Sequence, residues 1–139
     1  MPHFSRLQRN AITGDLLVLV MLTVAGFATH LTLDAFGRML VTTIGVVVAW
    51  VAVAPFLNVY DEDVIEDPGS VWRVGWAWML AAPMATFLRG AMLDRDIPWV
   101  FVLVTILANG FALVAWRIGY GWWLARKGRV ASMSTSKPR

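Results

Sequence analysis

Six polar side chains at the ends or in the interior of long apolar stretches are the main candidates for chemistry in this chain. An ionisable group inside a bilayer costs about 2.5–3.5 kcal/mol at the centre of a helix, so its depth and its partner decide its role. A carboxylate next to a guanidinium forms an ion pair, a histidine exchanges protons near neutral pH, and an amide bonds across helices. The six residues are Asp15, His30, Arg73, Arg89, Asn109 and Arg117.

Three of them should meet at one end of a helix bundle. Asp15 opens the first apolar stretch, Arg73 opens the third and Arg117 closes the fourth. Alternating helix directions bring these positions to one level, where Asp15 can form a bidentate pair with Arg117 or Arg73. We expect such a pair to hold the helix ends together; the alternative is a proton or anion site.

The other three lie elsewhere. His30 is about 22 Å along a helix from Asp15, near the opposite end, at the level of Arg89. It acts either as a pH switch or, as we expect, as an interfacial residue bonded to a carbonyl or to Asp34. Asn109 is the strongly polar residue nearest the middle of its stretch, so its amide needs a partner across the bundle, because lipid offers none. A ligand contact is the alternative.

The elements that must position these residues are four apolar runs of about 18–19 residues, close to the roughly 20 that cross a bilayer. The chain is 58% hydrophobic and 15% charged, whereas a soluble domain averages about 45–50% and 25%. We therefore expect an all-α membrane protein, an up-down bundle of four transmembrane helices within residues 1–125. The spans lie at about 16–33, 39–57, 71–88 and 98–116, and residues 126–139 form a basic, disordered cytoplasmic tail.

The distribution of positive charge predicts the orientation. Of the 12 Lys and Arg residues, nine fall on the side of the two termini and three on the other side. The positive-inside rule then places both termini in the cytoplasm, and the protein in the cytoplasmic (inner) membrane. The three on the outer side are Arg38, Arg89 and Arg95.

Small and aromatic residues suggest further contacts. Ala77, Ala81 and Ala85 recur every four residues and form a stripe that permits close approach of another helix. Of the eight tryptophans, Trp72, Trp99, Trp122 and Trp123 fall at predicted membrane interfaces. The remaining four either pack or line a site for a lipid, quinone or pigment; they are Trp50, Trp76, Trp78 and Trp116.

Several activities lack support in the sequence. There is no cysteine, no glycine-rich phosphate loop and no serine-nucleophile elbow, and the two histidines lie on opposite sides. No catalytic residue, cofactor or metal site is therefore predicted. Aromatic residues do not alternate with a basic stripe, so nucleic-acid binding is not expected. We expect a protein that is not an enzyme.

Short motifs in a fixed order resemble the integral-membrane family called domain of unknown function 3054. The motifs are Gly14-Asp15, Gly26 to His30, Trp50 to Phe56, Arg89-Gly90, Pro98 to Val104 and Ala115-Trp116-Arg117. The resemblance implies four transmembrane helices in one unit and brings no established activity. It directs attention to Asp15, His30, Arg89, Trp116 and Arg117.

The leading hypothesis is an accessory or scaffold component of a membrane complex, which binds another membrane protein through the small-residue stripe and the exposed tryptophans. Its expected partners are the lipid bilayer and other membrane proteins or copies of itself. The alternatives are a small transporter or channel that acts as an oligomer, or a lipid- or quinone-binding protein. A transporter requires a cavity that reaches Asn109 or His30, whereas an accessory subunit requires none. The presence of a cavity therefore separates these hypotheses.

Overall fold

The computed structural model describes residues 4–29 and 36–135, and within them every regular element is a helix or 3₁₀ turn, with no strand. His30 and Asp34 lie outside the described residues. The order of elements is α1 (Arg6–Thr29), α2 (Phe36–Val53), the 3₁₀ turn η1 (Ala54–Leu57), α3 (Glu62–Glu66), the 3₁₀ turn η2 (Pro68–Val71), α4 (Trp72–Leu93) and α5 (Trp99–Thr135).

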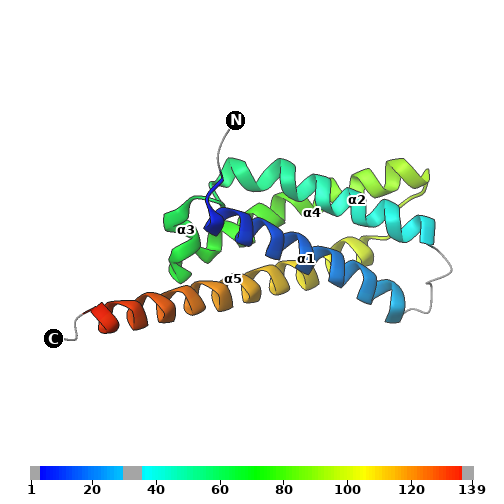
Figure 1. The fold of residues 1–139 in the computed structure, drawn as a ribbon. Coiled ribbons are helices and arrows are strands. Elements are labelled where there is room, and N and C mark those ends of the chain that lie inside the picture. The colour runs from blue at the N-terminus through cyan, green and yellow to red at the C-terminus, as the bar shows by residue number, and fades with distance from the viewer. Residues whose placement is uncertain (1–3, 30–35, 136–139) are drawn as a thin grey trace.

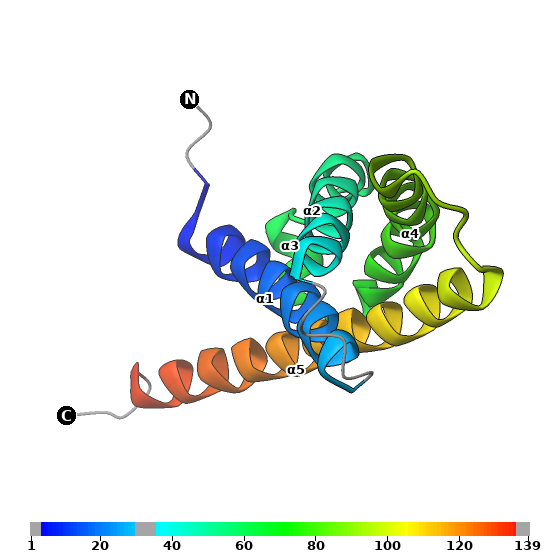
Figure 2. The same ribbon diagram turned by 90° about the vertical axis from the view of Figure 1, so that its right-hand side faces the viewer.

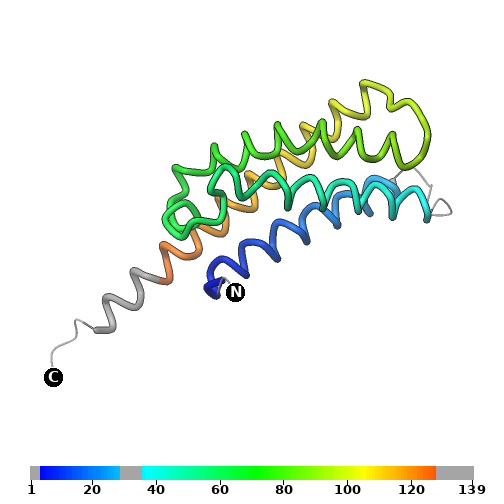
Figure 3. Tube along the Cα trace, turned by 90° about the horizontal axis from the view of Figure 1, so that it is seen from above, coloured from blue at the N-terminus to red at the C-terminus, as the bar shows by residue number. Residues whose placement is uncertain are grey.

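The four long helices form a bundle in which α2 packs along α4, α4 against α5, and α1 against both α2 and α5 (Figures 1 and 2). The start of α1, α3, η2 and the second half of α5 lie at one end, which we call the terminal end. The start of α2, the end of α4 and the start of α5 lie at the other, the distal end. Seen from above, the orange part of α5 continues past α3 at the terminal end (Figure 3).

Helix α1 begins ten residues before the predicted span. Its start is a capping box: the Ser5 hydroxyl accepts from Gln8 N–H at 3.2 Å, and Gln8 Oε1 accepts from Ser5 N–H at 2.9 Å. The Gln8 amide also donates to the Tyr60 carbonyl at 3.0 Å, which ties this turn to the α2–α3 connection. Asp15 therefore lies about two and a half turns inside a helix instead of at its opening.

The boundaries of the other helices also differ from the predicted spans. Pro55 confines the end of the second run to a 3₁₀ turn, and α4 continues five residues past Leu88. Helix α5 runs to Thr135, so the disordered tail expected from Arg126 is wrong for residues 126–135. No proline interrupts α5 before Pro138, and once formed a helix propagates at little cost. Residues 136–139 are outside the description.

Three segments among the described residues are long and apolar enough to cross a membrane: Arg6–Ala28, Phe36–Leu57 and Trp99–Lys127. Helix α4 has a suitable length but is less apolar, because it contains three Trp, two Arg and Pro83. Large apolar side chains point outward from the bundle, including Leu17, Met21, Phe87, Leu107 and Phe111. Such a continuous apolar exterior is typical of a surface that lipid covers.

Alanines and two tryptophans fill the interior. The rings of Trp50 and Trp78 are fully buried, with centroids 6.1 Å apart. The Trp78 indole N–H donates to the carbonyls of Thr105 and Ile106, so α4 is fastened to α5 near the middle of the bundle. Gly110 permits this contact, because a Cβ there would lie 2.9 Å from the Trp78 ring.

Candidate functional site

A buried ion pair closes the terminal end of the bundle. Arg117 Nε donates to Asp15 Oδ1 at 2.8 Å, and Arg117 Nη2 donates to Asp15 Oδ2 at 2.7 Å. The pair is therefore bidentate, which is the strongest geometry for these two groups. The Asp15 side chain is 0% exposed and that of Arg117 is 5% exposed. Of the two partners that the sequence offered to Asp15, the structure has Arg117.

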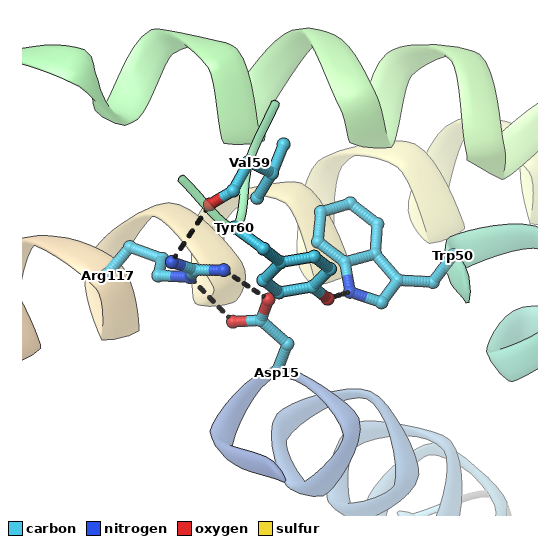
Figure 4. A network of polar contacts seen from close by, with 5 residues as sticks. All are labelled: Asp15, Trp50, Val59, Tyr60 and Arg117. Atoms are coloured by element: carbon cyan, nitrogen blue, oxygen red, sulfur yellow. Dashed lines mark hydrogen bonds and ion pairs between the residues drawn. The ribbon is translucent and has the colours of Figure 1, made fainter. Parts of the chain in front are cut away.

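The turn after η1 completes the surroundings of this pair (Figure 4). Asn58 has a left-handed backbone with φ of 55°, which asparagine tolerates better than most residues, and it reverses the chain toward the interior. The Val59 carbonyl then accepts from Arg117 Nη1 at 3.4 Å, and the Tyr60 ring lies 5.3 Å from the Arg117 guanidinium. The Tyr60 hydroxyl accepts from the Trp50 indole N–H at 2.8 Å.

Two sequence motifs that are about a hundred residues apart interlock here. Gly14 precedes Asp15, and Trp116 precedes Arg117. A Cβ placed on Gly14 would lie 2.1 Å from Trp116 Cζ2, so only glycine lets this indole lie against α1. The Trp116 side chain also lies beside the Asp15 carboxylate. The Gly-Asp motif of α1 and the Trp-Arg motif of α5 thus form one contact.

This arrangement is suited to holding helices together. Each charge neutralises the other and is shielded from solvent, so the pair is strongly coupled and costly to break. Burial, and next the charge of Asp15, raise the pKa of the Tyr60 hydroxyl above its usual value. Neither the cavity described below nor the one beside Pro83 is lined by Asp15 or Arg117.

Arg73 does not join this cluster. Its guanidinium lies 5.5 Å from the ring of Trp72, its neighbour in α4. Its Nε is buried and has no hydrogen-bond partner among the described residues. Arg73 thus shares the terminal end with Asp15, as the sequence predicts, but it is not the partner of that carboxylate.

The distal half of the bundle contains a cavity of about 350 Å³ bounded by α1, α2, α4 and α5. Its wall is largely apolar, with Leu22, Phe27, Val46, Phe101 and Val104. Its polar lining comprises Thr23, Arg38, Thr42, Arg89, Thr105 and Asn109. Two of the 13 lining residues are arginines, Arg38 and Arg89, one is the amide Asn109, and none is a carboxylate.

Arg89 lines this cavity and is held in place by contacts with α2 and α5. Its Nε donates to the Thr42 hydroxyl at 2.9 Å, and the same hydroxyl donates to the Arg38 carbonyl at 2.8 Å. The Arg89 guanidinium lies 4.5 Å from the Phe101 ring. Arg38 is near enough to act on Arg89 by charge repulsion. No ion pair joins either arginine to a carboxylate of the described residues.

Asn109 differs from the prediction that its amide bonds across the bundle. Its Nδ2 donates to the Thr105 carbonyl, one turn earlier in the same helix, at 3.2 Å. Its Oδ1 is buried without a partner in the described structure, and the residue lines the cavity. If the amide were flipped, its Oδ1 would face the Thr105 carbonyl oxygen, and two acceptors would meet. The Nδ2 therefore faces the Thr105 carbonyl, and Oδ1 points away from the helix backbone. An unpaired buried acceptor costs about 1–3 kcal/mol.

The structure changes the expectation that the alanine stripe of the third run receives another protein. Ala77, Ala81 and Ala85 are buried inside the bundle, where Ala85 comes so close to Gly45 that a Cβ on Gly45 would lie 3.1 Å from the Ala85 carbonyl oxygen. The stripe is therefore used between α2 and α4 and is not free for another protein.

The tryptophans fall into a group that packs within the protein and a group that is exposed on its surface. Trp50, Trp76, Trp78 and Trp116 do not line the cavity of the described residues, so they form no ligand site there. Trp116 stacks on Tyr120 with centroids 5.3 Å apart, and Tyr120 stacks on Trp123 at 5.9 Å. The four tryptophans predicted for membrane interfaces are all exposed: Trp72, Trp99, Trp122 and Trp123.

The helices and the two polar clusters define an all-helical protein with segments of membrane-spanning length. The chain belongs to the DUF3054 family, described as proteins of unknown function, whose profile matches residues 12–120. That range begins just before Gly14 and ends at Tyr120, so it includes both interlocked motifs and the whole cavity. No curated protein and no solved structure matches the chain.

Proposed function

We propose that this protein is a non-enzymatic, multi-pass protein of the cytoplasmic membrane that binds a small amphipathic molecule in its distal cavity. Ligand binding is the step that a small transporter shares with a lipid- or quinone-binding protein. The observation that carries the proposal is the cavity itself, whose lining includes Arg38, Arg89 and the buried Asn109. An accessory subunit without a ligand has no need of such a cavity, and the alanine stripe that would have received its partner is occupied.

The proposal includes four membrane crossings with both termini in the cytoplasm. Helix α4 supports a fourth crossing because its 22 residues span about 33 Å. It exposes Trp76, Leu80 and Phe87 on its outer side, and Arg73 and Arg89 stand near its two ends, where headgroups and water are within reach. The excess of basic residues at the terminal end supports the orientation.

The crossings are tested with single cysteines, which the chain naturally lacks. Glu62→Cys and Asp94→Cys place one thiol in each of the two connections that flank α4. In intact cells a membrane-impermeant maleimide should label Asp94→Cys alone, and both should react after lysis. Equal labelling of the two in intact cells would show that α4 does not cross, and labelling of Glu62→Cys alone would reverse the orientation.

Ligand binding is tested by extracting the protein from its native membrane in mild detergent and measuring its intact mass. We expect a monomer or homo-oligomer that carries a non-covalent small molecule. Asn109→Leu should lose this adduct, whereas Ala115→Leu, which adds similar bulk to the exposed side of α5, should retain it. Absence of any adduct, with the protein instead held in a complex of other membrane proteins, would overturn the proposal in favour of the accessory role.

A further inference from the structure

We infer that the distal cavity is selective for an amphipathic anion, with a phosphate or carboxylate head bound by Arg38 and Arg89 and an apolar body directed toward Asn109. The inference rests on the proposed function, because it names the class of ligand for the same cavity. It is carried by the charge of the lining, by the way in which Arg89 is positioned and by the apolar wall between Arg89 and Asn109.

The first observation is a pair of like charges in the lining of the cavity. Arg38 and Arg89 both line the cavity, act on each other by repulsion and have no carboxylate partner among the described residues. Two like charges at the edge of a low-dielectric space favour an anion between them. Arg117 at the terminal end is in the opposite situation, because Asp15 already satisfies it.

The second observation is the way in which Arg89 is positioned. Its Nε is bound by Thr42 and its guanidinium plane is held against Phe101, so two contacts fix the side chain. The terminal nitrogens of this guanidinium have no hydrogen-bond partner in the described structure. A fixed guanidinium with free donors matches the paired oxygens of a phosphate or carboxylate.

The third observation is the depth and lining of the cavity. Asn109 lies about 12 Å along α5 from Phe101, which marks the level of Arg89. Between these levels the wall is apolar, with Leu22, Val46 and Val104. An inorganic ion would leave this part empty, whereas a molecule with an apolar body fills it.

The positions of Arg38 and Arg89 along their helices agree with a ligand that has an anionic head. Arg38 is two residues from the start of α2, and Arg89 is one turn from the end of α4. In a membrane these positions lie near the headgroups, where an anionic lipid presents a phosphate and a soluble amphipathic anion can enter from water. Both sources share the chemistry of the inference, and the experiment distinguishes them.

The test uses the purified full-length protein in a non-ionic detergent, with decyl phosphate as the anionic probe and decanol as its neutral counterpart. Binding of each is measured by the shift in thermal unfolding across a concentration series. We expect decyl phosphate to stabilise the protein more strongly than decanol. Arg38→Gln and Arg89→Gln should each weaken the binding of decyl phosphate about tenfold or more and leave that of decanol unchanged.

Arg95→Gln is the matched control. It removes the same charge from the same end of the bundle, but Arg95 is exposed and does not line this cavity. Its affinity for decyl phosphate should stay within about twofold of the original. A loss equal to that in Arg38→Gln and Arg89→Gln would reduce the effect to overall charge and overturn the inference.

The remaining outcomes separate the inference from the proposed function. If both probes bind equally and the arginine variants change neither, while Asn109→Leu weakens both, the cavity binds ligands but does not select anions, and the inference fails alone. If neither probe binds, both fail. Competition identifies the source: phosphatidylglycerol that displaces decyl phosphate, where phosphatidylcholine does not, indicates an anionic lipid. Displacement by phenyl phosphate and not by phosphatidylglycerol indicates a soluble anion.

Discussion

The two ends of the bundle use the same residue types with opposite results. At the terminal end, Arg117 meets Asp15 and the Val59 carbonyl, and both charged side chains are buried. At the distal end, Arg38 and Arg89 face a cavity without a carboxylate among the described residues. A buried charge that is paired within the protein holds its helices together, whereas a charge without a carboxylate partner among the described residues retains the capacity to bind an anion. The two ends therefore differ in whether each arginine has a partner, and not in whether charged residues are present.

The largest effect that tests this comparison is expected from Arg117→Met. The change leaves the Asp15 carboxylate buried with no counter-charge, and breaking one side of such a pair costs about 3–5 kcal/mol. Reversible unfolding in mixed micelles of mild detergent and SDS should show a loss of that size. Arg126→Met removes an exposed arginine from the same helix and should have little effect.

A second variant checks the cause. Asp15→Leu combined with Arg117→Met removes both charges and should be more stable than Arg117→Met alone, because no unpaired charge remains. If the double variant instead loses the sum of the two single losses, the groups act independently and the terminal end is not a matched pair.

Gly14→Ala should give the next largest effect. The new methyl group would overlap the Trp116 ring, and overpacking of this kind costs about 1–3 kcal/mol. Gly119→Ala, where nothing lies within 4 Å of the added Cβ, should be neutral or slightly stabilising because alanine favours a helix. The same unfolding assay compares them, and equal losses would contradict the interlocking of the two motifs.

The sequence predicts the helical class, the approximate position of the four apolar runs and the pairing of Asp15 with an arginine. These follow from hydropathy and from the cost of an unpaired charge, both of which are local properties. The choice between Arg73 and Arg117 depends on which helices touch: α1 packs against α5 and not along α4, and hydropathy does not encode this. The contact between Gly14 and Trp116 follows from the same packing.

Other features could have been found from the sequence. Ser5 and Gln8 have the spacing of a capping box, which predicts the early start of α1. The cavity could not have been predicted from the sequence, because it depends on how four helices pack. The unpaired Oδ1 of Asn109 could not have been predicted either, because Nδ2 bonds within its own helix. His30, which the sequence places near this end, lies outside the described residues.

At the distal end, Arg89→Gln should change stability by less than about 1 kcal/mol. The variant loses the hydrogen bond to Thr42 but also removes the repulsion from Arg38, and it strands no buried carboxylate. Thermal unfolding without ligand, compared directly with Arg117→Met, measures the difference between the two ends. A loss as large as that of Arg117→Met would mean that the distal arginines are structural, and the comparison would break.

The smallest effect is expected at Asp67, which is polar and matched but fully exposed at the terminal end. Its carboxylate accepts from Gly69 N–H and from the Ser70 hydroxyl, both at 2.9 Å, and the Gly69 bond is the main cause that lowers the pKa of Asp67. A lowered pKa means that its contribution is complete above about pH 4 and is lost as the pH falls through the pKa of the folded state. The difference in unfolding midpoint between the original protein and Asp67→Asn should therefore shrink below about pH 4. Asp63→Asn removes one exposed carboxylate from the same connection and controls for the loss of a single negative charge. Parallel curves for Asp67→Asn would mean that its hydrogen bonds do not favour the charged form. Convergence would show that the paired but exposed Asp67 carboxylate stabilises the folded state. Together with the large loss in Arg117→Met, it would show that pairing makes a polar group at the terminal end stabilising and that burial determines how much free energy its loss costs.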